Sequence, residues 1–119
     1  MKKILVIEDN KDISSILKKL LEKNMFAVDV AETGYAVLAY LQGSKEPAAV
    51  VLDLFIPERS GIDLLDSLVS AWPYTKIFVY SAHSEWKTSL ERYPGVCRFF
   101  CKTDGMGNLI KAIQEELGV

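Results

Sequence analysis

Short apolar runs alternate with amphipathic stretches along the whole chain, and this alternation limits the possible folds more than any other feature. The apolar runs predict five strands, at residues 4–8, 27–31, 49–52, 76–81 and 97–101. The first, third and fourth runs are almost continuously apolar, which is typical of strands that are buried on both faces. In the second run, large apolar residues alternate with small or polar ones, which indicates a strand at the edge of the sheet.

The segments between the strands have the spacing of helices. After the first strand, apolar residues recur three and four positions apart, with charged residues on the opposite side. Either Asn10 or Asp12 can cap this first helix with a side-chain oxygen. A second helix is predicted from Thr33, as its cap, to about residue 43.

Three more helices are predicted in the second half of the chain, at about residues 61–72, 84–92 and 106–117. The first of them stops before Pro73, which cannot continue a helix, and the middle one has only a thin apolar face. Strands that alternate with helices imply a parallel sheet with right-handed crossovers and helices on both faces. We therefore expect one α/β domain over residues 1–119.

Composition and charge argue against several classes of function. The chain has 14 basic and 16 acidic side chains and a formal net charge of −2, whereas binding to a nucleic-acid backbone needs a basic face. No apolar run approaches the ~20 residues of a membrane span, and Glu8 and Asp9 end the first run too early for a signal peptide. We therefore expect a cytoplasmic protein that binds neither nucleic acid nor membrane. Cys97 and Cys101 would lie roughly 13 Å apart on one strand, too far for a disulfide, and are expected to be small buried residues.

Five residues with charged or hydroxyl side chains stand at the C-terminal ends of predicted strands. They are Glu8 and Asp9 at the first strand, Asp53 at the third, Ser81 at the fourth and Lys102 at the fifth. The C-terminal ends of parallel strands meet at one edge of the sheet, where ligands bind in a crevice. The sequence therefore predicts one site with three carboxylates, a hydroxyl and an ammonium group, which suits a divalent cation and a phosphoryl group.

These residues are less informative singly than as a set. The acidic pair can equally be a solvated turn, Lys102 an exposed lysine, and Ser81 an ordinary strand end. Asp53 is more specific, because a carboxylate next to a doubly buried strand is unfavourable unless it is paired or bound to a cation. Two carboxylates about 5 Å apart repel by roughly 3 kcal/mol at an effective dielectric constant of 20. Mg²⁺ would remove this repulsion, since it prefers oxygen ligands.

The order and spacing of these residues resemble the receiver domain of two-component response regulators. The pattern comprises the acidic pair, Asp53, Pro57 four residues later, Gly61 eight residues later, Ser81-Ala82 and Lys102. The resemblance extends over essentially all 119 residues. It implies a doubly wound, flavodoxin-like α/β fold with five helices and five parallel strands in the order 2-1-3-4-5.

The resemblance also implies a role for each residue of the site. Asp53 would accept the phosphoryl group, Lys102 and Ser81 would contact its oxygens, and Ser81 and Phe99 would act as the conformational switch. The Mg²⁺ ligands would be Glu8, Asp9, Asp53 and the backbone carbonyl of Phe55.

Several positions differ from the family pattern or modify it. Thr103 follows Lys102 where the family usually has a proline after a cis bond, and we expect a trans bond because cis before a non-proline residue costs about 3 kcal/mol. Phe99 lacks the hydroxyl of a tyrosine, so burial should favour its inward position. Phe55 and His83 would flank the path of the hydrolytic water; we expect Phe55 to slow loss of the phosphoryl group, whereas His83 can orient water or be an ordinary loop residue.

The predicted function is phosphorelay signal transduction. Asp53 would take a phosphoryl group from a phosphohistidine on a histidine kinase or a histidine phosphotransfer domain, and a protein-interaction surface would switch. The protein would be an acceptor and not a turnover enzyme, a monomer or weak dimer, and either a stand-alone regulator or a domain of a longer chain. Its output face would comprise the fourth helix, fifth strand and fifth helix, including Trp86, Tyr93 and Arg98, although Trp86 can equally pack in the core.

Two other functions have to be weighed. Thr103 and Phe99 make a docking module with the receiver fold but without phosphorylation conceivable, although the intact set of site residues argues against it. A small enzyme, such as an aspartyl-phosphate phosphatase or a flavin carrier, is the third possibility. The phosphatases usually have a second aspartate two residues after the first, where this chain has Phe55, and a Gly-rich phosphate-binding loop is absent.

Overall fold

A five-stranded parallel sheet forms the centre of the computed structural model, which describes residues 1–43 and 45–119. Its strands are β1 (Lys3–Ile7), β2 (Ala27–Ala31), β3 (Ala49–Leu52), β4 (Lys76–Ser81) and β5 (Val96–Cys101). They run in the order β2-β1-β3-β4-β5, and every neighbouring pair is parallel. The predicted doubly wound, flavodoxin-like fold is confirmed, and so is the position of β2 at an edge.

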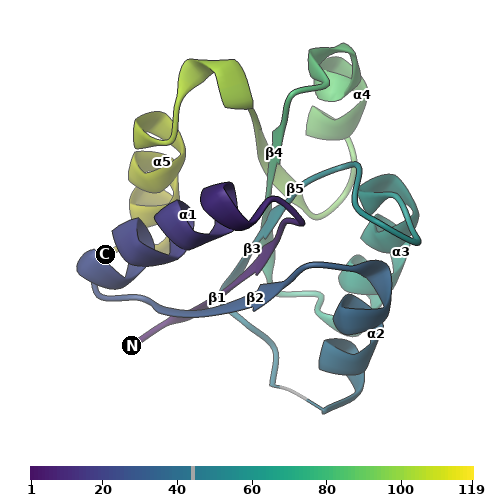
Figure 1. Ribbon diagram of the computed structural model, residues 1–119, viewed down its shortest axis with the longest axis horizontal. Coiled ribbons are helices and arrows are strands. Elements are labelled where there is room, and N and C mark those ends of the chain that lie inside the picture. Colours follow the sequence, from purple (N-terminus) through teal and green to yellow (C-terminus); the bar gives the residue numbers. More distant parts are fainter. Residues whose placement is uncertain (44) are drawn as a thin grey trace.

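Helices cover both faces of this sheet (Figure 1). They are α1 (Lys11–Lys23), α2 (Gly34–Gly43), α3 (Gly61–Ala71), α4 (Lys87–Glu91) and α5 (Gly107–Leu117). Helices α1 and α5 pack on one face, and α2, α3 and α4 pack on the other. Among the described residues, no helix has the length and apolar character that crossing a membrane requires.

Two apolar clusters hold the layers together, one on each face of the sheet. Within β1, Leu5 and Ile7 belong to the cluster under α2, α3 and α4, whereas Ile4 and Val6 belong to the cluster under α1 and α5. All four side chains are fully buried. This arrangement follows from the two-residue period of a strand, because a strand covered on both faces must be apolar at every position.

The helices begin at the polar residues that the sequence indicates. The side chain of Asn10 accepts hydrogen bonds from the backbone N–H groups of Asp12 (3.0 Å) and Ile13 (3.1 Å), so Asn10 and not Asp12 caps α1. Oγ1 of Thr33 accepts a hydrogen bond from the N–H of Ala36 (3.1 Å), as predicted for α2. Each cap satisfies backbone donors that have no partner within the helix.

The structure differs from the sequence-based expectations at the fourth helix. The continuous helix predicted at 84–92 is instead a 3₁₀ turn, Ser84–Trp86, followed by the short helix α4. Leu90 is the only buried residue in these two elements, and one apolar anchor does not support a long helix. Tyr93 packs against the core rather than forming a free surface, whereas Trp86 is 36% exposed.

Smaller differences concern the first and fifth strands. Strand β1 ends one residue before Glu8, so Glu8 lies in the loop beyond the strand ladder, and β5 begins one residue earlier than predicted. Cys97 and Cys101 are both free thiols, as expected, but they are half-buried rather than buried. Strand β5 is an edge strand, which leaves its side chains partly open to solvent.

Candidate functional site

The C-terminal edge of the sheet brings together charged residues that are far apart in the sequence. Glu8 follows β1, Asp53 follows β3 and Lys102 follows β5. The ammonium Nζ of Lys102 lies 2.5 Å from Oε1 of Glu8 and 3.3 Å from Oδ2 of Asp53. The lysine therefore bridges two carboxylates from two different loops.

A cluster of carboxylates surrounds this bridge. One carboxylate oxygen from each of Glu8, Asp9 and Asp53 lies within 4.8 Å of the other two. Glu8 and Asp53 are buried, with 2% and 7% of their surfaces exposed, while Asp9 faces solvent. Three carboxylates against one ammonium leave an excess of negative charge, and oxygen donors at this separation fit a hard divalent cation such as Mg²⁺. The cluster can therefore hold the predicted metal ion.

Burial perturbs the protonation of the bridged pair. It raises the pKa of Glu8 from its ordinary value of 4.5 to about 7, with the hydrogen bond from Lys102 acting against the shift and the charge of Asp53 adding to it. The N–H of Asn10 donates to Oε2 of Glu8 (3.2 Å) and also favours the charged form. Burial alone would lower the pKa of Lys102, but Glu8 and Asp53 outweigh it and raise this pKa, so the lysine stays charged.

A close backbone approach explains why a glycine stands eight residues after Asp53. A Cβ atom on Gly61 would lie 2.3 Å from the backbone oxygen of Asp53 and 2.8 Å from Cα of Leu54. The N–H of Gly61 also donates to the carbonyl of Leu54. The start of α3 thus packs directly against the backbone that carries the central carboxylate, and any side chain at Gly61 would displace it.

The two residues of the predicted switch are both buried. Ser81 is completely buried at the end of β4, where its Oγ accepts a hydrogen bond from the N–H of His83 (3.1 Å). Phe99 is 4% exposed and belongs to the apolar cluster under α2, α3 and α4. The ring therefore occupies the inward position that burial was expected to favour.

The two predicted modulators of water access contact each other at the rim of the site. The ring centroids of Phe55 and His83 lie 4.2 Å apart, with the ring planes tilted by 56°. Nδ1 of His83 is 3.2 Å from Oε1 of Glu85, and the Phe55 side chain remains 45% exposed. This aromatic contact joins the loop after β3 to the loop after β4, a pairing that no sequence pattern indicated.

The segment after Lys102 has the expected backbone. The described residues contain no cis peptide bond, so Lys102 and Thr103 are joined by a trans bond. Residues 102–104 form a 3₁₀ turn, and Oγ1 of Thr103 lies 3.2 Å from Sγ of Cys101. Replacement of the usual proline by Thr103 therefore does not prevent Lys102 from reaching the carboxylates.

Comparisons with known proteins identify the family. The family model described as the response regulator receiver domain matches residues 4–114. The transcriptional regulatory protein CpxR of Klebsiella pneumoniae is 40% identical over 68 residues, which cover 57% of this chain and 28% of that protein. The transcriptional regulatory protein CreB of Escherichia coli is 31% identical over 80 residues, which cover 67% of this chain and 34% of CreB. The chain thus spans about a third or less of these two relatives.

Solved structures agree with the family model. The response regulator TrrA of Thermotoga maritima, solved in complex with Mg²⁺–BeF, has a TM-score of 0.85 at 25% identity, over 98% of this chain and 99% of that one. A receiver domain from Methanospirillum hungatei has a TM-score of 0.89 at 23% identity, over 99% and 94% of the two chains, and supports the fold. The protein belongs to the family of response-regulator receiver domains.

Proposed function

We propose that the protein accepts a phosphoryl group on Asp53 in a Mg²⁺-dependent reaction and so relays a signal. The observation that carries the proposal is the bridge of Lys102 between Glu8 and Asp53, next to the third carboxylate of Asp9. Three carboxylates share a single ammonium group, and two of them are buried, so a divalent cation would balance the excess negative charge and a phosphoryl group could then bind beside it. TrrA, similar over nearly its whole length, was solved with Mg²⁺–BeF, which supports a cation at this position.

The proposed transfer is a substitution at phosphorus. A carboxylate oxygen of Asp53 attacks the phosphorus atom of a phosphohistidine, the P–N bond breaks, and the donor imidazole leaves with the electron pair of that bond. Lys102 then exchanges its contact with Asp53 for a contact with a phosphoryl oxygen. Because its pKa is raised, Lys102 keeps the positive charge that the developing negative charge requires.

The proposed metal ligands are Glu8, Asp9, Asp53 and the backbone carbonyl of Phe55. When bound, Mg²⁺ would neutralise the carboxylates and withdraw charge from the phosphoryl oxygens. Glu8 must be ionised to serve as a ligand, so the cation has to displace the proton that burial favours on this side chain. This competition predicts weaker Mg²⁺ binding in acid than at neutral pH.

The proposed response to phosphorylation involves Ser81 and Phe99. Oγ of Ser81 accepts a hydrogen bond from the N–H of His83. The hydroxyl group of Ser81 could in turn donate a hydrogen bond to a phosphoryl oxygen. Movement of Ser81 would alter the space beside the buried ring of Phe99, and the populations of two packings near β5 would shift. A groove of about 470 Å³ between α4, β5 and α5, lined by Lys87, Arg98 and Asn108 among others, is the candidate surface for the target protein.

The proposed partner upstream is a histidine kinase or a histidine phosphotransfer domain. In this scheme the protein is an acceptor and not a turnover enzyme. The relatives CpxR and CreB carry the name of transcriptional regulatory proteins, and this chain matches only part of each. We therefore propose phosphoryl acceptance, and no DNA binding, for this chain, in agreement with its net charge of −2.

One experiment tests the proposal directly. The protein is incubated with acetyl phosphate and Mg²⁺, and its intact mass is measured. We expect one added phosphoryl group in the unmodified protein and none in Asp53→Ala or in the presence of EDTA. Asp66→Asn, an exposed aspartate on α3, serves as the matched control and should be phosphorylated normally. Absence of an adduct in the unmodified protein would contradict the proposal and favour the docking module.

A further inference from the structure

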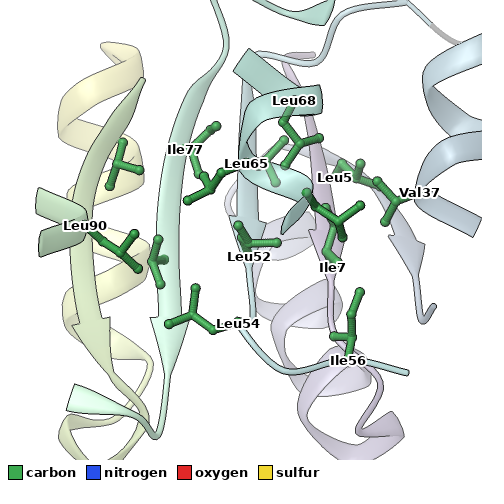
Figure 2. Close-up of a cluster of buried hydrophobic side chains, with 14 of the residues drawn as sticks. Leu5, Ile7, Val37, Leu52, Leu54, Ile56, Leu65, Leu68, Ile77 and Leu90 are labelled. Carbon is green, nitrogen blue, oxygen red and sulfur yellow. The ribbon is translucent and has the colours of Figure 1, made fainter. Parts of the chain in front are cut away.

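The loop between β3 and α3 is anchored to the core on one side and open on the other. Leu54 and Ile56, both labelled in Figure 2, are 0% and 8% exposed and belong to the cluster under α2, α3 and α4. Phe55 lies between them and projects outward, and it pairs with Ser60 in an isolated antiparallel bridge. The loop thus turns back on itself around the residue whose carbonyl is the proposed metal ligand.

The far end of this loop is attached to the start of α2. The carbonyl of Pro57 accepts a hydrogen bond from the N–H of Gly34 (3.1 Å), and Oε1 of Glu58 accepts one from the N–H of Tyr35 (3.2 Å). These N–H groups belong to the first two residues of α2 and have no acceptor within the helix. A carboxylate at this position is also favoured by the helix dipole. We call these two hydrogen bonds the loop–helix clasp.

The clasp holds Glu58 in an unfavourable backbone conformation. Its φ is +75°, in the left-handed region that residues with a Cβ atom rarely adopt. The next residue, Arg59, lies so close to α2 that a Cβ atom on Gly34 would be 3.0 Å from Cβ of Arg59. A strained residue persists where its surroundings stabilise it, and here the bond from Tyr35 to the Glu58 carboxylate offsets the strain.

We propose that Glu58 is a positioning residue for the metal site. Its carboxylate accepts a hydrogen bond from the N–H of Tyr35. This bond would hold the loop from Asp53 to Glu58, before any cation binds, in the conformation that directs the Phe55 carbonyl towards the metal site. Without the clasp, the loop would sample other conformations, and only a fraction of the molecules would have the loop in its metal-binding conformation. The apparent dissociation constant for Mg²⁺ would rise by the inverse of that fraction. The inference rests on the proposed Mg²⁺ site.

A merely structural role of Glu58 makes a different prediction. If its carboxylate only caps α2, its removal changes the stability of the fold and leaves the affinity for Mg²⁺ unchanged. Glu58→Ala separates the two effects, because alanine loses the acceptor and keeps the Cβ atom that disfavours positive φ. If Glu58 only caps α2, this variant unfolds at a lower urea concentration in EDTA but binds Mg²⁺ as tightly as the unmodified protein.

The experiment is a titration of the chelator-treated protein with MgCl₂, followed by the amide signals in ¹H–¹⁵N NMR spectra. We expect the dissociation constant of Glu58→Ala to be about fivefold higher than that of the unmodified protein, which corresponds to a loop that spends about one fifth of the time in the metal-binding conformation. Glu58→Gln keeps an oxygen acceptor and should bind within about twofold of the unmodified protein. Glu46→Ala is the matched control, because Oε1 of Glu46 accepts the N–H of Tyr74 (2.9 Å) at the opposite end of the strands.

Binding of Mg²⁺ by Glu58→Ala within twofold of the unmodified protein would overturn the inference, and so would an equal loss in Glu46→Ala. A complete failure of the unmodified protein to bind Mg²⁺ would instead refute the proposed function. The two failures are therefore distinguishable in the same set of titrations.

Discussion

Replacement of Glu8 by glutamine should stabilise the metal-free protein, although it removes a side chain that contacts Lys102. Burial raises the pKa of Glu8 from 4.5 to about 7, so the folded state disfavours the ionised carboxylate. The difference between these pKa values corresponds to about 3 kcal/mol. Glutamine has nearly the same shape without the charge, and its amide oxygen can still accept a hydrogen bond from Lys102.

The pH dependence of this effect follows from proton linkage. The folded state binds more protons than the unfolded state between pH 4.5 and about 7, so the contribution of Glu8 to stability is lost as pH rises through this window. In EDTA, Glu8→Gln should gain about 3 kcal/mol over the unmodified protein at pH 8 and less than about 1 kcal/mol at pH 5. Saturating Mg²⁺ should reduce or reverse this gain in stability, because only the unmodified protein has the Glu8 carboxylate as a metal ligand.

Urea unfolding in EDTA at pH 5 and pH 8, repeated with Mg²⁺ at pH 8, measures these changes. Glu22→Gln on α1 is the control, because this glutamate is exposed, and its replacement should change the unfolding free energy by less than about 0.5 kcal/mol. A Glu8→Gln protein that is less stable than the unmodified one at pH 8 in EDTA would refute the reasoning. It would show that the bond between Glu8 and Lys102 outweighs the burial of the charge.

Three further predictions concern the same site. Lys102→Met should destabilise the protein by about 2 kcal/mol in EDTA, since two carboxylates lose their shared cation, and Mg²⁺ should recover part of this loss in urea unfolding. Gly61→Ala should cost about 3 kcal/mol, because its Cβ would overlap the Asp53 backbone, whereas Gly107→Ala has no heavy atom within 4 Å and should change little. Phe55→Asn should shorten the half-life of the phosphorylated protein severalfold by admitting water, and an unchanged or longer half-life, measured by phosphate release, would contradict the proposed role of this ring.

The architecture followed from the sequence because its two periodicities are local. Strands buried on both faces are apolar at every position, so β1, β3 and β4 stand out as continuous apolar runs. The parallel topology then brings the residues after the strands to one edge, and for this reason the sequence predicts that Glu8, Asp53 and Lys102 lie together. Asn10 and Asp12 were equivalent as caps in the sequence, and only the position of the Asn10 side chain distinguished them.

The contacts that define the site depend on the tertiary structure. Two of these contacts have no local signal: the bridge of Lys102 between Glu8 and Asp53, and the ring pair of Phe55 with His83. The loop–helix clasp is the clearest case, because Tyr35 and Glu58 are 23 residues apart and meet only when Glu58 adopts a positive φ.

The sequence by itself thus determined the order of the elements and the edge of the sheet at which the chemistry lies. The tertiary structure alone decided which atoms of those residues meet and how charge is distributed among them. The physical reason is that strand and helix patterns repeat over two to four residues, whereas a contact between two loops depends on backbone conformations that no repeat encodes. Burial of Glu8 beside Lys102, and with it the raised pKa of Glu8, arises only when those loops converge.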